Sequence, residues 1–263
     1  MNLAMQTYRS PGAVVRETAP SRAGIAQCWR LEIPPGPAGE YRCAQLHDYL
    51  PQKSRRQFSW RAPLRLELRA RVSAPDLPGT WGFGLWNDPF TASLGIRGMA
   101  RRLPALPNTA WFFFAGKPNY LAFRDTHPAQ GFLAATFSSP ALSVLLLAPG
   151  LLTAPLLWLR PAARLLRRIA SLWIAEDAAV TPVDPTTWHT YRLHWESQRV
   201  SFEVDGIPVL NTPVTPRGPL GLVIWIDNQY AAFPPSGQIA MGASAHAGPA
   251  WLEIEDLSVS SRW

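Results

Sequence analysis

The chain has 263 residues, a length that suits one large all-β domain or two ordinary domains. Hydrophobic residues make up 47% and charged residues only 16%, which fits a globular protein with a sizeable core. The net charge of +7 comes almost entirely from arginine, and the arginines are scattered through the strand-like segments instead of gathering on one face. This scatter argues against a nucleic-acid-binding protein.

Most of the chain alternates between short strand-like runs and turn residues. Residues 64–72 alternate apolar and charged side chains, which predicts a half-buried antiparallel strand. Asp205–Gly206 separates two later runs and is a strong hairpin-turn signal. Further strands are expected at residues 27–33, 40–49, 80–87, 109–115, 120–125, 131–138, 188–196, 199–205, 207–210, 220–228 and 251–260. This rhythm predicts an all-β fold, a single antiparallel β-sandwich domain over residues 1–263.

The two cysteines, Cys28 and Cys43, fall in strands that we expect to be neighbours. A cross-strand disulfide is one interpretation, and a pair of reduced core thiols is the commoner state in a cytosolic chain. The sequence has no Cys/His spacing typical of a metal site. The N-terminal residues lack a basic region followed by an apolar run. We therefore expect a cytoplasmic protein that uses no metal and no cofactor.

Residues 138–178 interrupt the strand rhythm with an apolar, helical insertion. Residues 141–159 carry no charge, but two prolines and a glycine interrupt them and strands lie on both sides, so we do not expect a transmembrane helix. Residues 159–174 have the spacing of an amphipathic helix. Its expected arginine stripe is Arg160, Arg164, Arg167 and Arg168, and its expected apolar side is Leu159, Ala163, Leu166, Ile169 and Trp173.

Three interpretations of this insertion stay open. It could be a helical hairpin packed on the sandwich, or a lid over an apolar cleft. It could also be a basic amphipathic segment, residues 141–174, that makes a peripheral contact with the inner membrane surface.

Four segments match the strand patterns of one known fold. Residues 188–195 read WHTYRLHW, residues 200–206 read VSFEVDG, residues 79–86 read GTWGFGLW and residues 252–259 read LEIEDLSV. Together they resemble the concanavalin A-like lectin/glucanase superfamily, in particular its laminarinase-like glycoside hydrolases. The resemblance covers more than half of the chain and implies a jelly-roll sandwich whose tryptophan-rich strand forms the floor of a cleft.

The chain departs from those hydrolases at their catalytic strand. They carry the pattern E-x-D-x-E, whose carboxylates serve as nucleophile, orienting residue and general acid. A retaining mechanism needs two carboxyl groups about 5–5.5 Å apart. The corresponding strand here, residues 109–115, reads TAWFFFA and has no carboxylate. We therefore do not expect a standard retaining glycoside hydrolase, and the aromatic replacement predicts an apolar cleft floor.

The aromatic strands and the polar residues that end them form the candidate ligand site. Because side chains alternate along a strand, one set of these aromatic residues must lie in the core between the sheets, and only the other set can line a cleft. The expected ligand-binding residues are Trp81, Phe83, Trp86, Asn87, Trp111, Phe113, Trp225, Asn228 and Tyr230.

Three aspartates are candidate catalytic acids. Asp227 shares a strand face with Trp225, and burial beside aromatic rings would raise the pKa of its carboxyl group and let it donate a proton. Asp88 and Asp125 also follow strands, although ordinary turn chemistry is the simpler explanation for both.

These residues predict one function and two alternatives. The main prediction is binding of an apolar small molecule, a terpenoid or a lipid, extended by acid-catalysed cyclisation, isomerisation or hydration. The first alternative is a non-hydrolytic carbohydrate-binding relative of the glucanases, and the second is a structural protein associated with a membrane surface. A sugar site surrounds each tryptophan with several polar side chains, whereas an apolar pocket needs few, so the surroundings of the tryptophans separate the first two.

Overall fold

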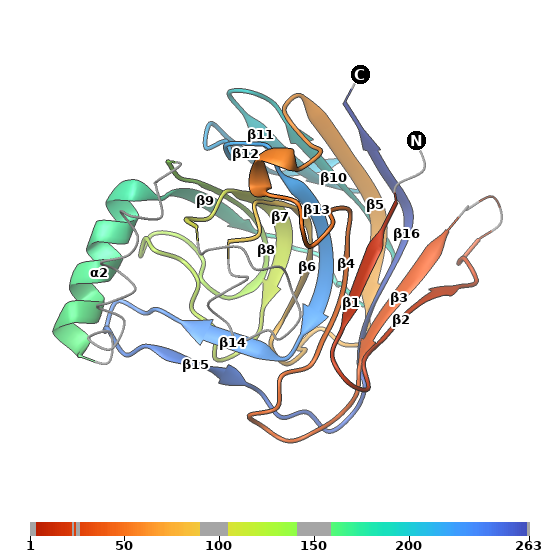
Figure 1. Cartoon of the computed structure of the whole chain (residues 1–263), viewed down its shortest axis with the longest axis horizontal. Coiled ribbons are helices and arrows are strands. Elements are labelled where there is room, and N and C mark those ends of the chain that lie inside the picture. Colours follow the sequence, from red (N-terminus) through yellow and green to blue (C-terminus); the bar gives the residue numbers. More distant parts are fainter. Residues whose placement is uncertain (1–3, 23, 25–26, 90–104, 141–158, 262–263) are drawn as a thin grey trace.

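Two antiparallel sheets of seven strands each stack face to face in the computed structural model (Figure 1). The structure describes residues 4–22, 24, 27–89, 105–140 and 159–261. The first sheet has the order β1 (Gln6–Arg9), β4 (Cys43–His47), β13 (Gly221–Asp227), β6 (Thr80–Trp86), β7 (Thr109–Ala115), β8 (Gly131–Ser138) and β9 (Ala175–Val180). The second has the order β12 (Ile207–Thr212), β11 (Val200–Val204), β10 (His189–Trp195), β5 (Leu64–Val72), β16 (Ala250–Ser260), β3 (Cys28–Ile33) and β2 (Val14–Thr18). The predicted β-sandwich is confirmed.

Smaller elements lie outside the two sheets. They are the hairpin of β14 (Gln229–Ala232) and β15 (Ala240–Ala243), the helix α2 (Arg160–Trp173) and the short 3-10 helix η1 (Arg55–Gln57). In Figure 1, α2 lies at the left edge of the molecule, and both termini lie on the opposite side. None of the helices in the described ranges combines the length and apolar character needed to cross a membrane.

The core between the sheets takes one face of each strand. On β6 this face carries Trp81 and Phe83, both almost fully buried. The Trp81 ring stacks on Phe114 of the same sheet at 5.6 Å, and Phe83 meets Tyr191 of the second sheet edge-on at 5.0 Å. The expectation that Trp81 and Phe83 bind ligand is therefore corrected: alternation along β6 points both into the inter-sheet core.

Strand predictions match best where the alternation or aromatic content is strong. The predicted bounds of β5, β7 and β8 agree with the structure to the residue, while β1, β2, β9, β14 and β15 were not predicted. Residues 120–125, predicted as a strand, form only one isolated bridge, between Tyr120 and Ala232. Side chains satisfy this backbone instead: Arg167 donates to the Ala122 carbonyl, and Glu176 accepts from the next two N–H groups.

The cysteines lie farther apart in the fold than the sequence suggests. Cys28 is on β3 in the second sheet and Cys43 is on β4 in the first, so their strands are not paired neighbours. Both thiols are buried and free. Burial raises the pKa of the Cys43 thiol well above its ordinary range, which keeps it protonated.

The insertion connects two strands that pair with each other. β8 and β9 are antiparallel neighbours, and α2 lies in the connection between them, so the helix expected at 159–174 is present. The uncharged part of the prediction, residues 141–158, lies outside the described residues.

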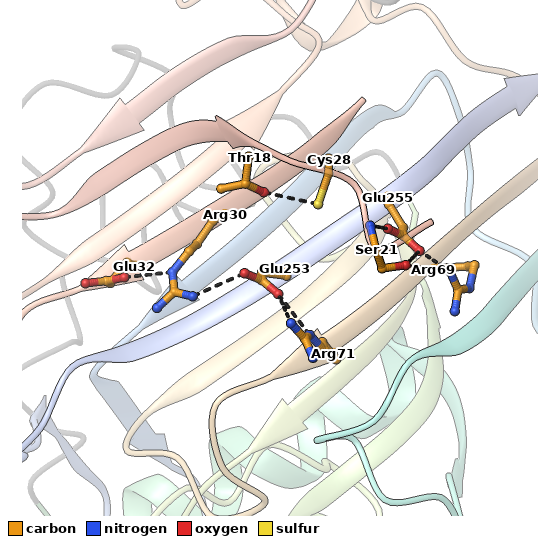
Figure 2. Close-up of polar contacts among 9 residues, drawn as sticks. All are labelled: Thr18, Ser21, Cys28, Arg30, Glu32, Arg69, Arg71, Glu253 and Glu255. Atoms are coloured by element: carbon orange, nitrogen blue, oxygen red, sulfur yellow. Dashed lines mark hydrogen bonds and ion pairs between the residues drawn. The ribbon is translucent and has the colours of Figure 1, made fainter. Parts of the chain in front are cut away.

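The outer face of the second sheet carries a network of ion pairs between arginines and carboxylates (Figure 2). Glu253 of β16 accepts from Arg30 of β3 at 3.1 Å and from Arg71 of β5 at 2.9 Å. Glu255, fully buried, accepts from the Ser21 hydroxyl at 2.6 Å and from Arg69. The carboxylates of the closing strand therefore serve as cross-strand ion pairs on the face of the second sheet that points away from the core.

Candidate functional site

The outer face of the first sheet carries a second group of aromatic side chains, separate from the inter-sheet core. Trp86 of β6 stacks on Trp225 of β13 with ring centroids 6.3 Å apart and planes inclined by only 6°. Trp111 of β7 lies 5.3 Å from Trp225 and 5.4 Å from Phe113. We call this group the aromatic cluster; its aromatic members are Tyr49, Phe58, Trp86, Trp111, Phe113 and Trp225.

Two glycines of β6 make room for these rings. Gly82 and Gly84 face Phe113 and Trp111 across the strand pair. A Cβ atom at Gly84 would come within 2.5 Å of Trp111, and one at Gly82 within 2.9 Å of the Trp225 ring. The two faces of this strand therefore differ: Trp81, Phe83 and Leu85 fill the core, and the glycines on the opposite face let neighbouring indoles lie across the sheet.

Polar side chains of β4 border the aromatic cluster. Gln45 pairs with Trp225 across the strands, and its side-chain nitrogen lies 3.3 Å from Nδ1 of His47. The His47 ring lies 4.7 Å from Tyr49, whose hydroxyl accepts a hydrogen bond of 2.8 Å from Nε1 of Trp86. Sequence reasoning missed Gln45, His47 and Tyr49, although their spacing of two within a predicted strand was the signal that they share a face.

Trp111 is the member of the cluster with an unsatisfied donor. Its Nε1 is buried and has no hydrogen-bond partner among the described residues, whereas Nε1 of Trp225 donates to the Thr80 hydroxyl at 2.9 Å. A buried N–H group without a partner loses free energy comparable to a lost hydrogen bond. The Trp111 Nε1 group is therefore a buried donor inside the aromatic cluster that the described residues leave unsatisfied.

Asp227 is connected to the aromatic cluster through Thr80. The Thr80 hydroxyl donates to Oδ1 of Asp227 at 2.8 Å, and the Tyr41 hydroxyl lies 3.4 Å from Oδ2. Burial raises the pKa of Asp227 to about 7, although the hydrogen bond from Thr80 favours the carboxylate. The raised pKa agrees with the sequence argument, and the role of Asp227 as a proton donor stays a prediction.

The other two candidate acids are each engaged by an arginine. Asp125 is two-thirds exposed, and its carboxylate forms an ion pair of 2.5 Å with Arg167 of α2. Asp88 is buried in a turn with a positive φ of 50°, and its carbonyl accepts from Arg55 at 2.6 Å. These contacts engage both aspartates within the fold, and the catalytic role expected for them stays a prediction.

The structure places the three polar residues expected to bind ligand within local contacts of the fold. The Asn87 amide joins the backbone of Leu106 and Asn108. The Asn228 amide, fully buried, accepts from the Arg42 backbone at 2.7 Å and donates to two carbonyls. Tyr230 lies opposite Gly242 in the β14–β15 hairpin and is not part of the aromatic cluster. Hydrogen bonds engage the two amides locally, and the expected contact of all three side chains with a ligand stays a prediction.

The aromatic cluster contains no pair of carboxylates. Its described members are aromatic or aliphatic, and Asp227 reaches them only through Thr80. Within the described ranges, no group of three His, Cys, Asp or Glu side chains could hold a metal ion. The arrangement therefore offers stacking surfaces, one imidazole, one carboxamide and one indole N–H group for binding.

Known proteins resemble this chain in fold only. No family model matches the sequence, and no curated protein matches it. An endo-β-1,4-glucuronan lyase from the fungus Trichoderma reesei has a similar structure over 98% of this chain and 90% of its own, with 9% identity and a TM-score of 0.51. At this identity the likeness shows a shared β-sandwich fold alone.

Two further solved structures show weaker similarity. A β-glucanase from Bacillus licheniformis matches over 97% of this chain and 94% of its own, with 10% identity and a TM-score of 0.48. LamAcat from Zobellia galactanivorans matches over 87% of this chain and 75% of its own, with 12% identity and a TM-score of 0.45.

Proposed function

We propose that the protein binds a carbohydrate on the outer face of its first sheet. The observation that carries the proposal is the aromatic cluster bordered by Gln45 and His47 on the same face. Indole rings offer flat apolar surfaces to the C–H faces of a sugar ring, and amide and imidazole groups can bond its hydroxyls. The unpaired Nε1 of Trp111 supplies a buried donor for a sugar oxygen.

Hydrolysis by a retaining two-carboxylate mechanism is not part of this proposal. The strand that would carry the carboxylates, β7, presents Trp111 and Phe113 on the outer face instead. The similar glucuronan lyase acts, by its name, on a polysaccharide, and the transfer of that ligand class to this chain is itself part of the proposal.

A second candidate is binding of an apolar ligand, a terpenoid or a lipid, with Asp227 as an acid for cyclisation, isomerisation or hydration. The observation that favours it is that two of the three indoles are satisfied inside the protein, Trp86 by Tyr49 and Trp225 by Thr80. A carboxyl group with a pKa of about 7 is partly protonated at neutral pH and can donate a proton.

Binding of oligosaccharides by a Trp111→Phe variant tests the carbohydrate proposal. A glycan array identifies a ligand for the wild-type protein, and calorimetry then compares the variants. Phenylalanine keeps a ring but removes Nε1, so the affinity should fall about two- to tenfold, the effect of one hydrogen bond. His47→Ala should also weaken binding, and Trp251→Phe, a matched change on the outer face of the second sheet, should leave the affinity unchanged.

Native mass spectrometry of the purified protein separates the two candidates. A bound lipid or terpenoid together with an empty glycan array would contradict the carbohydrate proposal and favour the second candidate. A bound glycan would support the carbohydrate proposal. If the only ligand found is apolar, and the Trp111→Phe variant binds it with the same affinity as the wild type, the carbohydrate proposal would be opposed.

A further inference from the structure

Helix α2 packs on the protein through Ala163 and Arg167, its two buried residues. Arg167 is buried, and its guanidinium donates to the carbonyls of Ala122 and Phe233, the latter at 2.8 Å. The same group forms an ion pair with Asp125 at 2.5 Å and lies 5.3 Å from the ring centre of Tyr120. These four contacts hold the guanidinium against the protein, so Arg167 fixes which side of the helix faces inward.

The apolar side of α2 consequently faces outward. Leu172 is 84% exposed and Trp173 is 51% exposed. An amphipathic helix on a globular protein normally buries its apolar stripe against the core, and here the orientation is reversed. The large apolar side chains of this outward face are Leu165, Leu166, Ile169, Leu172 and Trp173.

The charges of α2 are all positive. The helix contains four arginines and no acidic residue, and three of the arginines are exposed. Arg164, Arg168 and Leu172 follow one another at intervals of four residues, so the two arginines flank the apolar face along one side. Arg164 donates to the Ser236 carbonyl at 2.9 Å, which attaches this flank to the loop between β14 and β15.

We propose that the outward face of α2 docks on an anionic lipid bilayer surface. Apolar side chains with a flanking row of arginines suit the boundary between lipid headgroups and acyl chains, and a tryptophan at the helix end suits the same region. The 14 residues of the helix extend about 21 Å, less than the roughly 30 Å of a hydrocarbon core, so the helix lies in the plane of the surface. This proposal does not depend on the carbohydrate proposal.

Co-sedimentation with vesicles tests the docking surface. Vesicles of phosphatidylcholine alone are compared with vesicles of equal parts phosphatidylcholine and phosphatidylglycerol. The wild-type protein should bind the anionic vesicles more tightly, and added salt should weaken that binding. Leu172→Glu should lower partitioning at least about tenfold, and Arg168→Gln about fivefold on anionic vesicles only.

Ile207→Glu is the matched control. Ile207 is 69% exposed on β12, away from α2, so the same change there should leave vesicle binding as in the wild type. Equal binding to both vesicle types, or equal losses in the two glutamate variants, would overturn the proposal. A wild-type dimer in light scattering that Leu172→Glu converts to a monomer would also overturn it, because a second copy would then cover this face.

Discussion

Asp227 couples the stability of the protein to pH. Its pKa in the fold is about 7, against an ordinary value of 3.8. An acid whose pKa is raised by folding contributes stability that is fully present below about pH 4 and is lost as the pH rises through 7. The free energy of unfolding should therefore decrease between these two values, and Asp227 is the group to change in order to detect it.

Asp227→Asn should flatten this pH dependence. The amide is neutral at every pH, keeps an oxygen for the N–H groups of Thr80 and Gln229, and offers an N–H donor toward Tyr41. Urea unfolding of both proteins at about pH 5 and about pH 8 measures the difference. The wild type should lose on the order of 2 kcal/mol more than the variant between these conditions; parallel losses would show that the carboxyl group does not titrate in this range.

At the level of single residues, the sequence predicts which side chains share a face but not which face is covered. The alternation places Trp225 and Asp227 together and separates Trp81 from Trp86, as the structure has it. Whether a face of β6 meets the second sheet depends on how the sheets stack, which no local pattern contains. His47 escaped notice for a related reason: its spacing from Gln45 marks a shared face, but every residue of the strand is buried, so the pattern does not show which face carries the aromatic cluster.

At the level of elements, strands are predictable where one face is clearly more polar than the other or where the run is strongly aromatic. β5 shows strict alternation of buried and half-buried residues, and its predicted bounds were correct. β9, with the sequence AEDAAV, has neither feature and was missed; it is specified by its pairing with β8 after a long connection. Residues 120–125 have strand-like composition, but their backbone groups form hydrogen bonds with side chains from α2 and β9 instead of with a neighbouring strand.

Arg167 holds α2 on the sandwich, and Arg167→Ala should release it. The variant loses two bonds to carbonyls and an ion pair, and it leaves the Ala122 and Phe233 carbonyls without this donor. We expect a loss of about 2–3 kcal/mol in the free energy of unfolding. Hydrogen exchange should rise across Arg160–Trp173.

Arg168→Ala is the control for this prediction. Arg168 is an arginine one position along the same helix, and it is exposed. Its replacement should change stability by less than about 0.5 kcal/mol. Similar hydrogen exchange in the two variants would mean that α2 is held by other contacts and that its inward face is not set by Arg167.

At the level of the whole molecule, the two sheets differ in what they present on their outer faces. The first sheet carries the aromatic cluster, which suits a ligand with flat apolar surfaces. The second carries ion pairs that cross β3, β16 and β5, together with cation–π contacts such as Arg30 over Trp251 at 4.4 Å. The sandwich thus has one outer face with clustered aromatic rings and one occupied by its own charge network.

Glu255 is where that charge network matters most for the fold, because its carboxylate is fully buried between Ser21 and Arg69. Removing one partner of a buried pair leaves the other charge uncompensated, so Glu255→Gln should lower the free energy of unfolding by about 3 kcal/mol. Asp256→Asn changes the next residue, whose pair with Arg22 is exposed, and should cost less than about 1 kcal/mol. Denaturant unfolding compares the two; equal losses would mean that burial adds nothing to the Glu255 pair, and the second sheet would then depend on its apolar face alone.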